Sequence, residues 1–251
     1  MRLSVFIAQK YNISRRTAKE YIKNGFVISG KSIITKDIDI LGNEDIILNV
    51  PQNNISYNLN DYIIYQDNNY IFFYKPPFMH SERNTISDSL TVSDIYKNFP
   101  DFKPLSRLDY EADGVIGIIS KNIPLNNISK SYYAVVCGDF KSNITLSNKI
   151  DADNKQKVKV LEDNGGFPAV IKKVSSNGKY SLVSVALEKA ARHQVRAFLS
   201  YLHFPILGDK LYGGANFKRL CLHCFSYTIN DVTVMCKKQT DEFLKMYKSL
   251  D

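Results

Sequence analysis

The sequence predicts an α+β protein with a small N-terminal domain and a larger domain built on a mixed or largely antiparallel sheet. Apolar residues with helical spacing occur in the first fifty residues and again near residue 195, whereas strand patterns dominate after residue 62 without a regular strand–helix alternation. Between the two regions, the asparagine-rich residues 51–61 lack apolar periodicity. We therefore expect domains at 1–50 and 62–251, joined by a linker at 51–61.

Two short helices are expected at the start of the N-terminal domain. Apolar residues in the segment 3–7 have helical spacing, and Ser14 is a suitable N-cap for a second helix over 15–24, which Gly25 can end. The unit is completed by strands at 26–28 and 46–48 and a turn at 30–31. The sequence thus predicts a compact αα-β unit.

Basic residues are concentrated in this domain. The chain has a formal net charge of +8, and residues 1–36 hold eight lysines and arginines against a single acidic residue, a net +7. Arg15, Lys19 and Lys23 recur at helical spacing and share one face, beside Arg16. Such a surface suits a polyanion, because it displaces counterions from phosphates. A solvated helix face without a binding role is the alternative.

The composition places the chain among soluble cytoplasmic proteins. Hydrophobic residues make up 44% and charged residues 23% of the chain. No apolar run approaches the roughly 18 residues of a membrane-spanning helix, and the first residues do not form a signal peptide. Four cysteines in a chain of 251 residues are expected to be reduced. We expect no membrane association, and the sequence indicates no oligomeric state.

Cysteine and histidine cluster at residues 221–224, which raises the question of a metal site. In a strand, Cys221 and His223 would face one side and Cys224 the other. The chain has no second CxxC pair, so buried thiols in a core strand are favoured over a zinc site. We expect no metal.

The second domain is expected to begin with a β-hairpin. Aromatic and β-branched residues at 62–65 and 70–74 flank a turn at 67–69, and Lys75-Pro76-Pro77 ends the second strand. Further strands are expected at 115–120, 132–137, 158–161, 169–174 and 181–187. An apolar stripe predicts a helix over 193–203.

Asp109 stands out as a candidate reactive group. The segment 107–114 (RLDYEADG) places it beside Arg107 on a loop that ends at Gly114, and an apolar strand follows. A rigid strand holds a reactive group in position, and an adjacent cation favours the ionised carboxylate that a nucleophile requires. The same residues, taken alone, also fit a surface turn with a salt bridge.

Several segments of the second domain occur together in one order. They are Tyr74-Lys75-Pro76, residues 107–114, residues 130–138 (KSYYAVVCG), residues 192–196 (RHQVR), residues 205–213 (PILGDKLYG) and residues 219–223 (RLCLH). From residue 62 to about 235 the chain resembles the RluA-type pseudouridine synthases. The N-terminal unit resembles the S4-like RNA-binding domain that this family often carries, through residues 2–3, 13–15, 18, 22, 25, 27, 30–31 and the approach to the final strand at 42–45.

This resemblance implies an RNA pseudouridine synthase and gives roles to three residues. Asp109 would be the nucleophile, Tyr132 the active-site tyrosine and Arg196 the arginine that pairs with the aspartate. The reaction breaks and remakes a bond from base to ribose without net redox change, so no cofactor is implied. The implied partner is RNA, with ribosomal RNA favoured over transfer RNA, and we expect Arg107 and Arg192 to contribute to its binding.

The chemistry gives each of these residue types a purpose. Tyr132 alternates along its predicted strand with Ala134 and Val136, where its ring could stack on a flipped uracil and its hydroxyl could take part in proton transfer at C5. The sequence does not choose between attack of Asp109 on the sugar, attack on the base, and a glycal route.

The chain also departs from the family pattern. Ser106 stands where the family usually has histidine, Ala112-Asp113 replaces Thr-Ser, and residues 189–192 (Lys-Ala-Ala-Arg) replace Thr-Gly-Arg-Thr. Asp113 is expected to add negative charge near the path of the RNA. Lys75-Pro76 and the loop with Asp209 and Tyr212 are expected to be structural.

These departures, which include Ala190 and Ala191, leave open an alternative function. In this alternative the chain is a catalytically retired synthase, which binds RNA with the same fold but no longer catalyses the reaction. A third alternative is a small-molecule hydrolase that uses Asp109, but this alternative gives the basic N-terminal domain no role.

Overall fold

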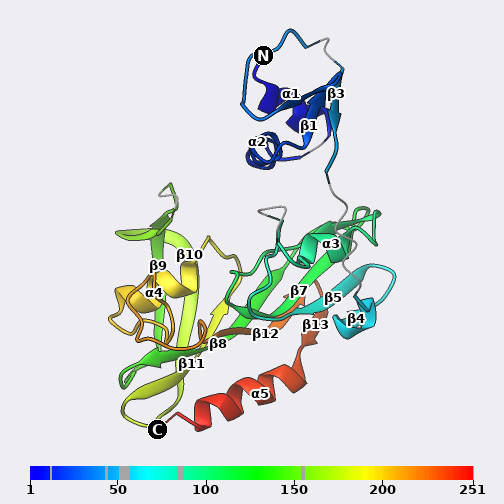
Figure 1. Cartoon of the computed structure of the whole chain (residues 1–251). Helices are drawn as coiled ribbons and strands as arrows, with labels where there is room; N and C mark the ends of the chain where they lie inside the picture. The colour runs from blue at the N-terminus through cyan, green and yellow to red at the C-terminus, as the bar shows by residue number, and fades with distance from the viewer. Residues whose placement is uncertain (12, 43–44, 51–56, 84–87, 154–155, 251) are drawn as a thin grey trace. The chain divides into compact units, whose positions relative to one another are not determined.

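The computed structural model describes residues 1–11, 13–42, 45–50, 57–83, 88–153 and 156–250 (Figure 1). The chain divides into two compact units. One comprises Met1–Tyr57 with Glu82–Asp94, and the other Asn58–Ser81 with Ile95–Asp251. Of the expected linker, residues 51–56 lie outside the described residues, and Leu59–Asp61 forms a short 3₁₀ helix, η1.

The first unit has the expected pair of helices and a small sheet. Helix α1 spans Leu3–Lys10 and α2 spans Arg15–Lys23, and the Ser14 side chain caps α2 by accepting the Thr17 backbone N–H at 3.0 Å. Strands β1 (Val27–Ser29), β2 (Ser32–Ile34) and β3 (Ile46–Leu48) form an antiparallel sheet in the order β2-β1-β3. Its core is formed by Leu3, Ile7, Ala18, Ile22, Val27, Ile40 and Ile46.

The second unit is built on a ten-stranded mixed sheet. The order is β4-β5-β7-β12-β8-β11-β10-β9, with β6 paired to β7 and β13 paired to β12. Only the pairing of β7 with β12 is parallel among those described. The strands are β4 (Ile63–Gln66), β5 (Tyr70–Lys75), β6 (Phe102–Pro104), β7 (Asp113–Ser120), β8 (Ile128–Cys137), β9 (Ile144–Asp151), β10 (Lys159–Ser176), β11 (Tyr180–Leu187), β12 (Leu222–Ile229) and β13 (Val232–Met235). The expected α+β class and the opening hairpin are confirmed.

Helices are few beside this sheet. Helix α4 (Gln194–Tyr201) contacts β10, and α5 (Lys237–Lys248), which the sequence analysis did not predict, contacts β12 (Figure 1). The expected helix over 193–203 is confirmed in shortened form, because His193 has a left-handed backbone with φ 55°. A further short helix, α3, spans Val92–Tyr96.

The expectation of separate strands at 158–161 and 169–174 is wrong. Both segments belong to the long strand β10, which pairs with β9 across two shifts of register. Gly165 takes a positive φ of 96°, and a Cβ on Gly166 would lie 2.2 Å from the Asn148 carbonyl oxygen. The two glycines therefore accommodate an irregularity of register within one strand.

A close approach of β7 and β12 fixes the start of β7. Asp113 and Gly114 pair in parallel with His223 and Cys224, and Gly114 has a φ of 127°. A Cβ at residue 114 would lie 2.1 Å from the backbone oxygen of Cys224. Glycine is therefore required there, and the loop that precedes β7 is anchored beside the middle of the sheet.

Candidate active site

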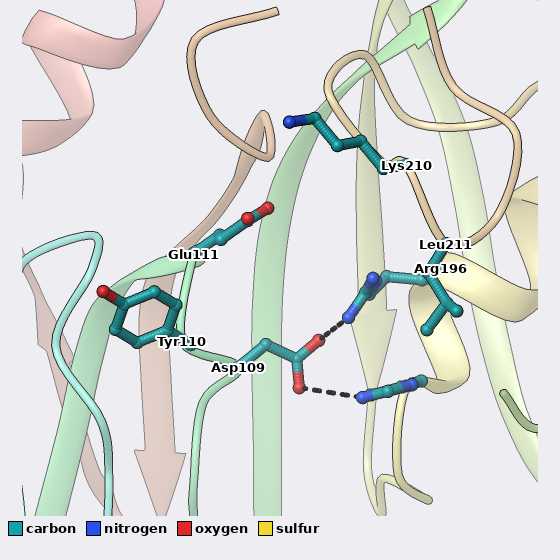
Figure 2. Close-up of a pocket in the computed structure, with 7 residues that line it drawn as sticks. Asp109, Tyr110, Glu111, Arg196, Lys210 and Leu211 are labelled. Carbon is teal, nitrogen blue, oxygen red and sulfur yellow. Dashed lines mark hydrogen bonds and ion pairs between the residues drawn. The ribbon is translucent and has the colours of Figure 1, made fainter. Parts of the chain in front are cut away.

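A pocket of about 300 Å³ surrounds Asp109 (Figure 2). Asp109 comes from the loop before β7, its neighbours across the pocket come from the start of α4, and further residues come from the loop after α4. The side chain of Asp109 is 26% exposed. The lining consists of Asp109, Tyr110, Glu111, His193, Arg196, Lys210 and Leu211. Segments far apart in the sequence thus converge on one partly exposed carboxylate.

Arg196 joins Asp109 to a second, fully buried carboxylate. Its Nη1 lies 2.9 Å from Asp109 Oδ2, while its Nε and Nη2 bind the two oxygens of Asp209 at 2.7 and 2.8 Å. The Asp209 side chain is 0% exposed. Burial alone would lower the pKa of Arg196, but the bonds to Asp209 and the charges of both carboxylates raise that pKa above its ordinary value. Arg196 is a permanent cation here.

The sequence analysis gave Asp209 only a role in shaping a loop, and that expectation was incomplete. Gly208 precedes it with φ 83°, and a Cβ there would lie 1.9 Å from the Arg219 carbonyl oxygen. The turn therefore runs against neighbouring backbone and directs Asp209 inward, where it also accepts the Tyr212 backbone N–H at 3.2 Å. An arginine beside the apolar stripe of a helix needs a buried counter-charge. This need is the feature of the sequence that could have pointed to an acidic partner such as Asp209.

His193 also contacts Asp109, although sequence reasoning assigned it no role. Its Nε2 lies 3.6 Å from Asp109 Oδ1, and its Nδ1 lies 3.2 Å from the Tyr212 hydroxyl. Burial lowers the pKa of His193, and the positive charges of Arg196 and Arg192 act in the same direction, against the pull of Asp109. The imidazole is therefore neutral near pH 7, and Arg196 is the charged partner of Asp109.

Tyr132 lies on β8 and is buried, with 5% of its surface exposed. It is the cross-strand partner of Cys224. Burial, together with the charges of Cys224 and Asp109, raises the pKa of Tyr132 well above its ordinary value. The phenol is therefore neutral. It is not among the residues that line the pocket, so the structure brings Asp109 and Arg196 into contact but does not bring Tyr132 into the pocket lining.

Lys75 anchors the loop that carries Asp109 through hydrogen bonds to backbone carbonyls. Its fully buried amine donates hydrogen bonds to the carbonyls of Pro76, Met79 and Tyr110 at 2.9, 3.0 and 3.3 Å. Burial lowers the pKa of Lys75 to about 7, although Asp113 and Asp109 oppose the shift. The contact with Tyr110, the residue after Asp109, fits the expected structural role of the Lys-Pro pair.

Asp113 is buried inside the sheet, so the expectation that it adds negative charge to a surface that RNA could contact was wrong. It is 3% exposed and pairs with Arg219, with His223 Nδ1 at 3.2 Å and with the Tyr74 hydroxyl, which donates at 3.0 Å. Burial alone would raise its pKa, but His223 and Arg219 outweigh burial and lower it. The charge is thus neutralised inside the sheet, at the parallel junction of β7 and β12.

The six residues expected to bind RNA are all exposed. Four lie on α2 in the first unit and two in the second unit, close in sequence to the pocket residues Asp109 and His193. They are Arg15, Arg16, Lys19 and Lys23, and Arg107 and Arg192. Their exposure leaves them accessible to a large polyanion.

The thiols of Cys221, Cys224 and Cys236 are free and buried. Among the described residues, no group of three or more histidine, cysteine and acidic side chains could hold a metal ion. Within the same residues, every helix is too short or too polar to cross a membrane.

Known proteins resemble both the sequence and the fold of this chain. Residues 69–201 match the family model described as RNA pseudouridylate synthase. The ribosomal large subunit pseudouridine synthase D of Borreliella burgdorferi is 31% identical over 74% of this chain and 66% of its own length. The enzyme of that name from Vibrio parahaemolyticus is 25% identical over 85% of this chain and 73% of its own length.

Solved structures agree on the fold. The human RNA pseudouridylate synthase domain containing 1 superposes with a TM-score of 0.56 over 72% of this chain and 84% of its own, at 19% identity. The family model covers more than half of the chain, including Asp109, Tyr132 and Arg196. The resemblance read from the ordered motifs is confirmed, and the chain belongs to the RNA pseudouridylate synthase family.

Proposed function

We propose that this protein isomerises uridine to pseudouridine in ribosomal RNA and that the Asp109 carboxylate begins the reaction. The observation that carries the proposal is the position of Asp109, which lies partly exposed in a pocket with an arginine nitrogen 2.9 Å from one oxygen. The RNA class is inferred from two relatives that are named as ribosomal large subunit pseudouridine synthases. A ribosomal substrate also agrees with the expected cytoplasmic location.

The reaction needs a carboxylate but no cofactor. It breaks the bond between N1 of uracil and C1′ of ribose, turns the base, and joins C5 to C1′. C5 loses a proton and N1 gains one, so atoms and electrons balance without an oxidant or reductant. A carboxylate can attack the sugar or the base, or support a glycal route, and the partial exposure of Asp109 in the pocket is compatible with each of these routes.

Arg196 prepares the carboxylate for this role. Its charge offsets the cost of holding Asp109 in a partly dry pocket, and its direct bond orients the reacting group. Because Asp209 fixes the guanidinium from the other side, this orientation does not depend on the substrate.

Tyr132 is proposed to act together with the nucleophile. For its ring to stack on the flipped uracil, the base must pass beyond the residues that line the pocket in the free chain, and the neutral hydroxyl of Tyr132 would then relay the proton that leaves C5. Its burial beside Cys224 supports a fixed ring position.

The basic face of α2 is proposed to anchor structured RNA. The two helices, the small sheet and the exposed cations of the first unit support an S4-like RNA-binding domain in residues 1–50. This domain would precede a synthase domain in residues 62–251.

Release of tritium from 5-tritiated uridine in bulk cellular RNA tests the reaction directly. We expect release with the wild-type protein and none with Asp109→Ala, while Asp231→Asn, which removes an exposed carboxylate from the turn after β12, should release tritium at the wild-type rate. Equal release by wild type and Asp109→Ala would remove Asp109 from the mechanism.

The same assay decides the alternative of a retired synthase. Salt-dependent RNA binding, combined with no release of tritium from any RNA of a full transcriptome, would favour that alternative. The burial of Asp113 removes part of its motivation, because this departure from the family pattern forms an internal ion pair. Mapping pseudouridines in cells with and without the gene would then identify the target uridine.

A further inference from the structure

Exposed aromatic rings lie beside the pocket and have no part in the proposed reaction. The residues Phe78 and Tyr110 are 47% and 43% exposed, and their ring centroids lie 5.8 Å apart in an edge-to-face arrangement. The ring of His80 stacks on Tyr110 with centroids 4.2 Å apart and an interplanar angle of 26°. We call Phe78, His80 and Tyr110 the aromatic platform. It adjoins the pocket, because Tyr110 follows Asp109 and lines it (Figure 2).

The platform is held in place by an unusual backbone. Phe78 has a left-handed conformation with φ 63°, which residues other than glycine rarely adopt. Its N–H donates to the Tyr110 carbonyl at 2.8 Å, and the buried amine of Lys75 donates to the same oxygen at 3.3 Å. Local strain of this kind persists where surrounding contacts enforce it, and it clusters at ligand sites. Here the strained residue carries an exposed aromatic ring.

We propose that the aromatic platform stacks a nucleobase that neighbours the target uridine. This inference rests on the proposed function, because its ligand is the RNA substrate. An enzyme that flips a base out of its stack must break the contacts between that base and its neighbours. An aromatic surface beside the pocket replaces the lost stacking, and because every base has a π-face, it does so without sequence preference.

The surroundings favour a nucleic acid over a protein partner. Lys210 is exposed and lines the pocket, and Arg107 is exposed two residues before Asp109 in the sequence, so both suit a phosphate backbone. A protein that covered the platform would also cover Tyr110 and obstruct the pocket that holds Asp109. A nucleotide next to the target uridine reaches the platform in the same binding event that fills the pocket.

The test compares two RNAs with the full-length protein. One is an oligonucleotide with a single uridine in an unpaired loop, and the other is the same RNA with an abasic site next to that uridine. Dissociation constants are measured by fluorescence anisotropy at one fixed salt concentration. We expect the wild-type protein to bind the abasic RNA roughly tenfold more weakly, as the loss of one stacked base predicts.

Variants of the platform should lose this discrimination. Phe78→Gly removes the ring but suits the left-handed backbone, so its thermal stability should not fall. Phe78→Gly and Tyr110→Ala should each bind the intact RNA roughly tenfold more weakly than wild type and bind both RNAs almost equally. Tyr110→Phe keeps the ring and should discriminate as wild type does. Leu125→Ala, which removes a side chain that is 48% exposed outside the pocket, should also do so.

The outcomes separate this inference from the proposed function. Tritium release by the wild type, combined with unchanged discrimination in Phe78→Gly and Tyr110→Ala, would overturn the platform and leave the synthase activity intact. Equal binding of both RNAs by the wild type would also overturn it. If the wild type neither bound RNA nor released tritium, both proposals would fail.

Discussion

Arg196 binds both oxygens of Asp209 in a two-pronged ion pair, with Nε to Oδ2 at 2.7 Å and Nη2 to Oδ1 at 2.8 Å. This geometry leaves Nη1 for Asp109, 2.9 Å away. A guanidinium is planar and rigid, so binding one edge fixes the direction of the remaining nitrogen. The cation that orients the proposed nucleophile is therefore itself oriented by a buried residue outside the pocket lining.

Replacing Asp209 by asparagine should slow the reaction without weakening RNA binding. Asparagine replaces one of the two acceptor oxygens with an NH2 group, which would face a guanidinium N–H donor, so Arg196 loses its fixed direction and Asp109 its alignment. Misplacement of a reacting group by about 1 Å costs on the order of a hundredfold in rate. We expect about that loss in single-turnover tritium release, with an unchanged dissociation constant for RNA.

Asp139→Asn is the matched control for this change, because it removes a surface aspartate that pairs with Lys141 and Lys173. It should leave the rate unchanged. A normal rate in Asp209→Asn would show that Arg196 needs no second carboxylate.

Arg196→Lys tests whether shape as well as charge is required. A lysine ammonium is a point charge and cannot bind Asp109 and Asp209 along two edges of one plane. We expect Arg196→Lys to lose most of its activity, close to the loss in Arg196→Ala, while both variants keep their RNA affinity. Recovery of near-wild-type rates in Arg196→Lys would reduce the role of Arg196 to electrostatics alone.

Asp113→Asn should destabilise the second unit. Asp113 is buried and pairs with the buried His223 and with Arg219, whose side chain is 14% exposed, so its neutralisation would leave that largely buried arginine without its counter-charge. Breaking a buried ion pair from one side costs roughly 3–5 kcal/mol. We expect a decrease of that order in the free energy of unfolding at pH 7, measured by urea denaturation.

The pH dependence of this difference is a second test of the same pair. The pKa of Asp113 is lowered in the folded chain, whereas an aspartate in an unfolded chain titrates near about 3.9. The stabilisation is therefore present above about pH 4 and is lost as the pH falls through the lower, folded pKa. The difference in unfolding free energy between wild type and Asp113→Asn should narrow below about pH 4, and a constant difference down to pH 2 would contradict the pairing.

The sequence was informative where local rules decide the structure. The Ser14 cap, the helix it begins and the hairpin of β4 and β5 follow from capping, periodicity and turn residues, and the structure confirms them. The Asp109–Arg196 contact was predicted from the family resemblance and is observed at 2.9 Å. It spans 87 residues of sequence, and no local pattern would have located it.

The missed features depend on tertiary contacts. Asp209 and Asp113 read as loop and surface acids, because sequence patterns do not show which cation a carboxylate meets after folding. Asp209 is buried by the turn at Gly208, and Asp113 by the approach of β7 to β12. The sequence analysis also predicted two strands where the structure has one, β10, because the pairing with β9 that continues across residues 162–168 is a tertiary contact.

Tyr132→Phe should separate stacking from proton transfer. The substitution keeps the ring and removes only the hydroxyl. General acid–base catalysis typically contributes about 10²–10⁴-fold, so we expect a loss of at least about tenfold in single-turnover rate with unchanged RNA affinity. An unchanged rate would restrict Tyr132 to stacking.

Charge reversal on α2 tests the RNA anchor. Arg15, Lys19 and Lys23 are exposed on this helix. Changing all three to glutamate should weaken RNA binding and reduce the slope of log affinity against log salt by about three, as the loss of three phosphate contacts predicts. The matched control reverses three exposed lysines of α5, which are Lys238, Lys245 and Lys248. A fall in affinity confined to the α2 variant would assign the contact to that helix, whereas equal losses in both variants would indicate a response to net charge and contradict the predicted anchor.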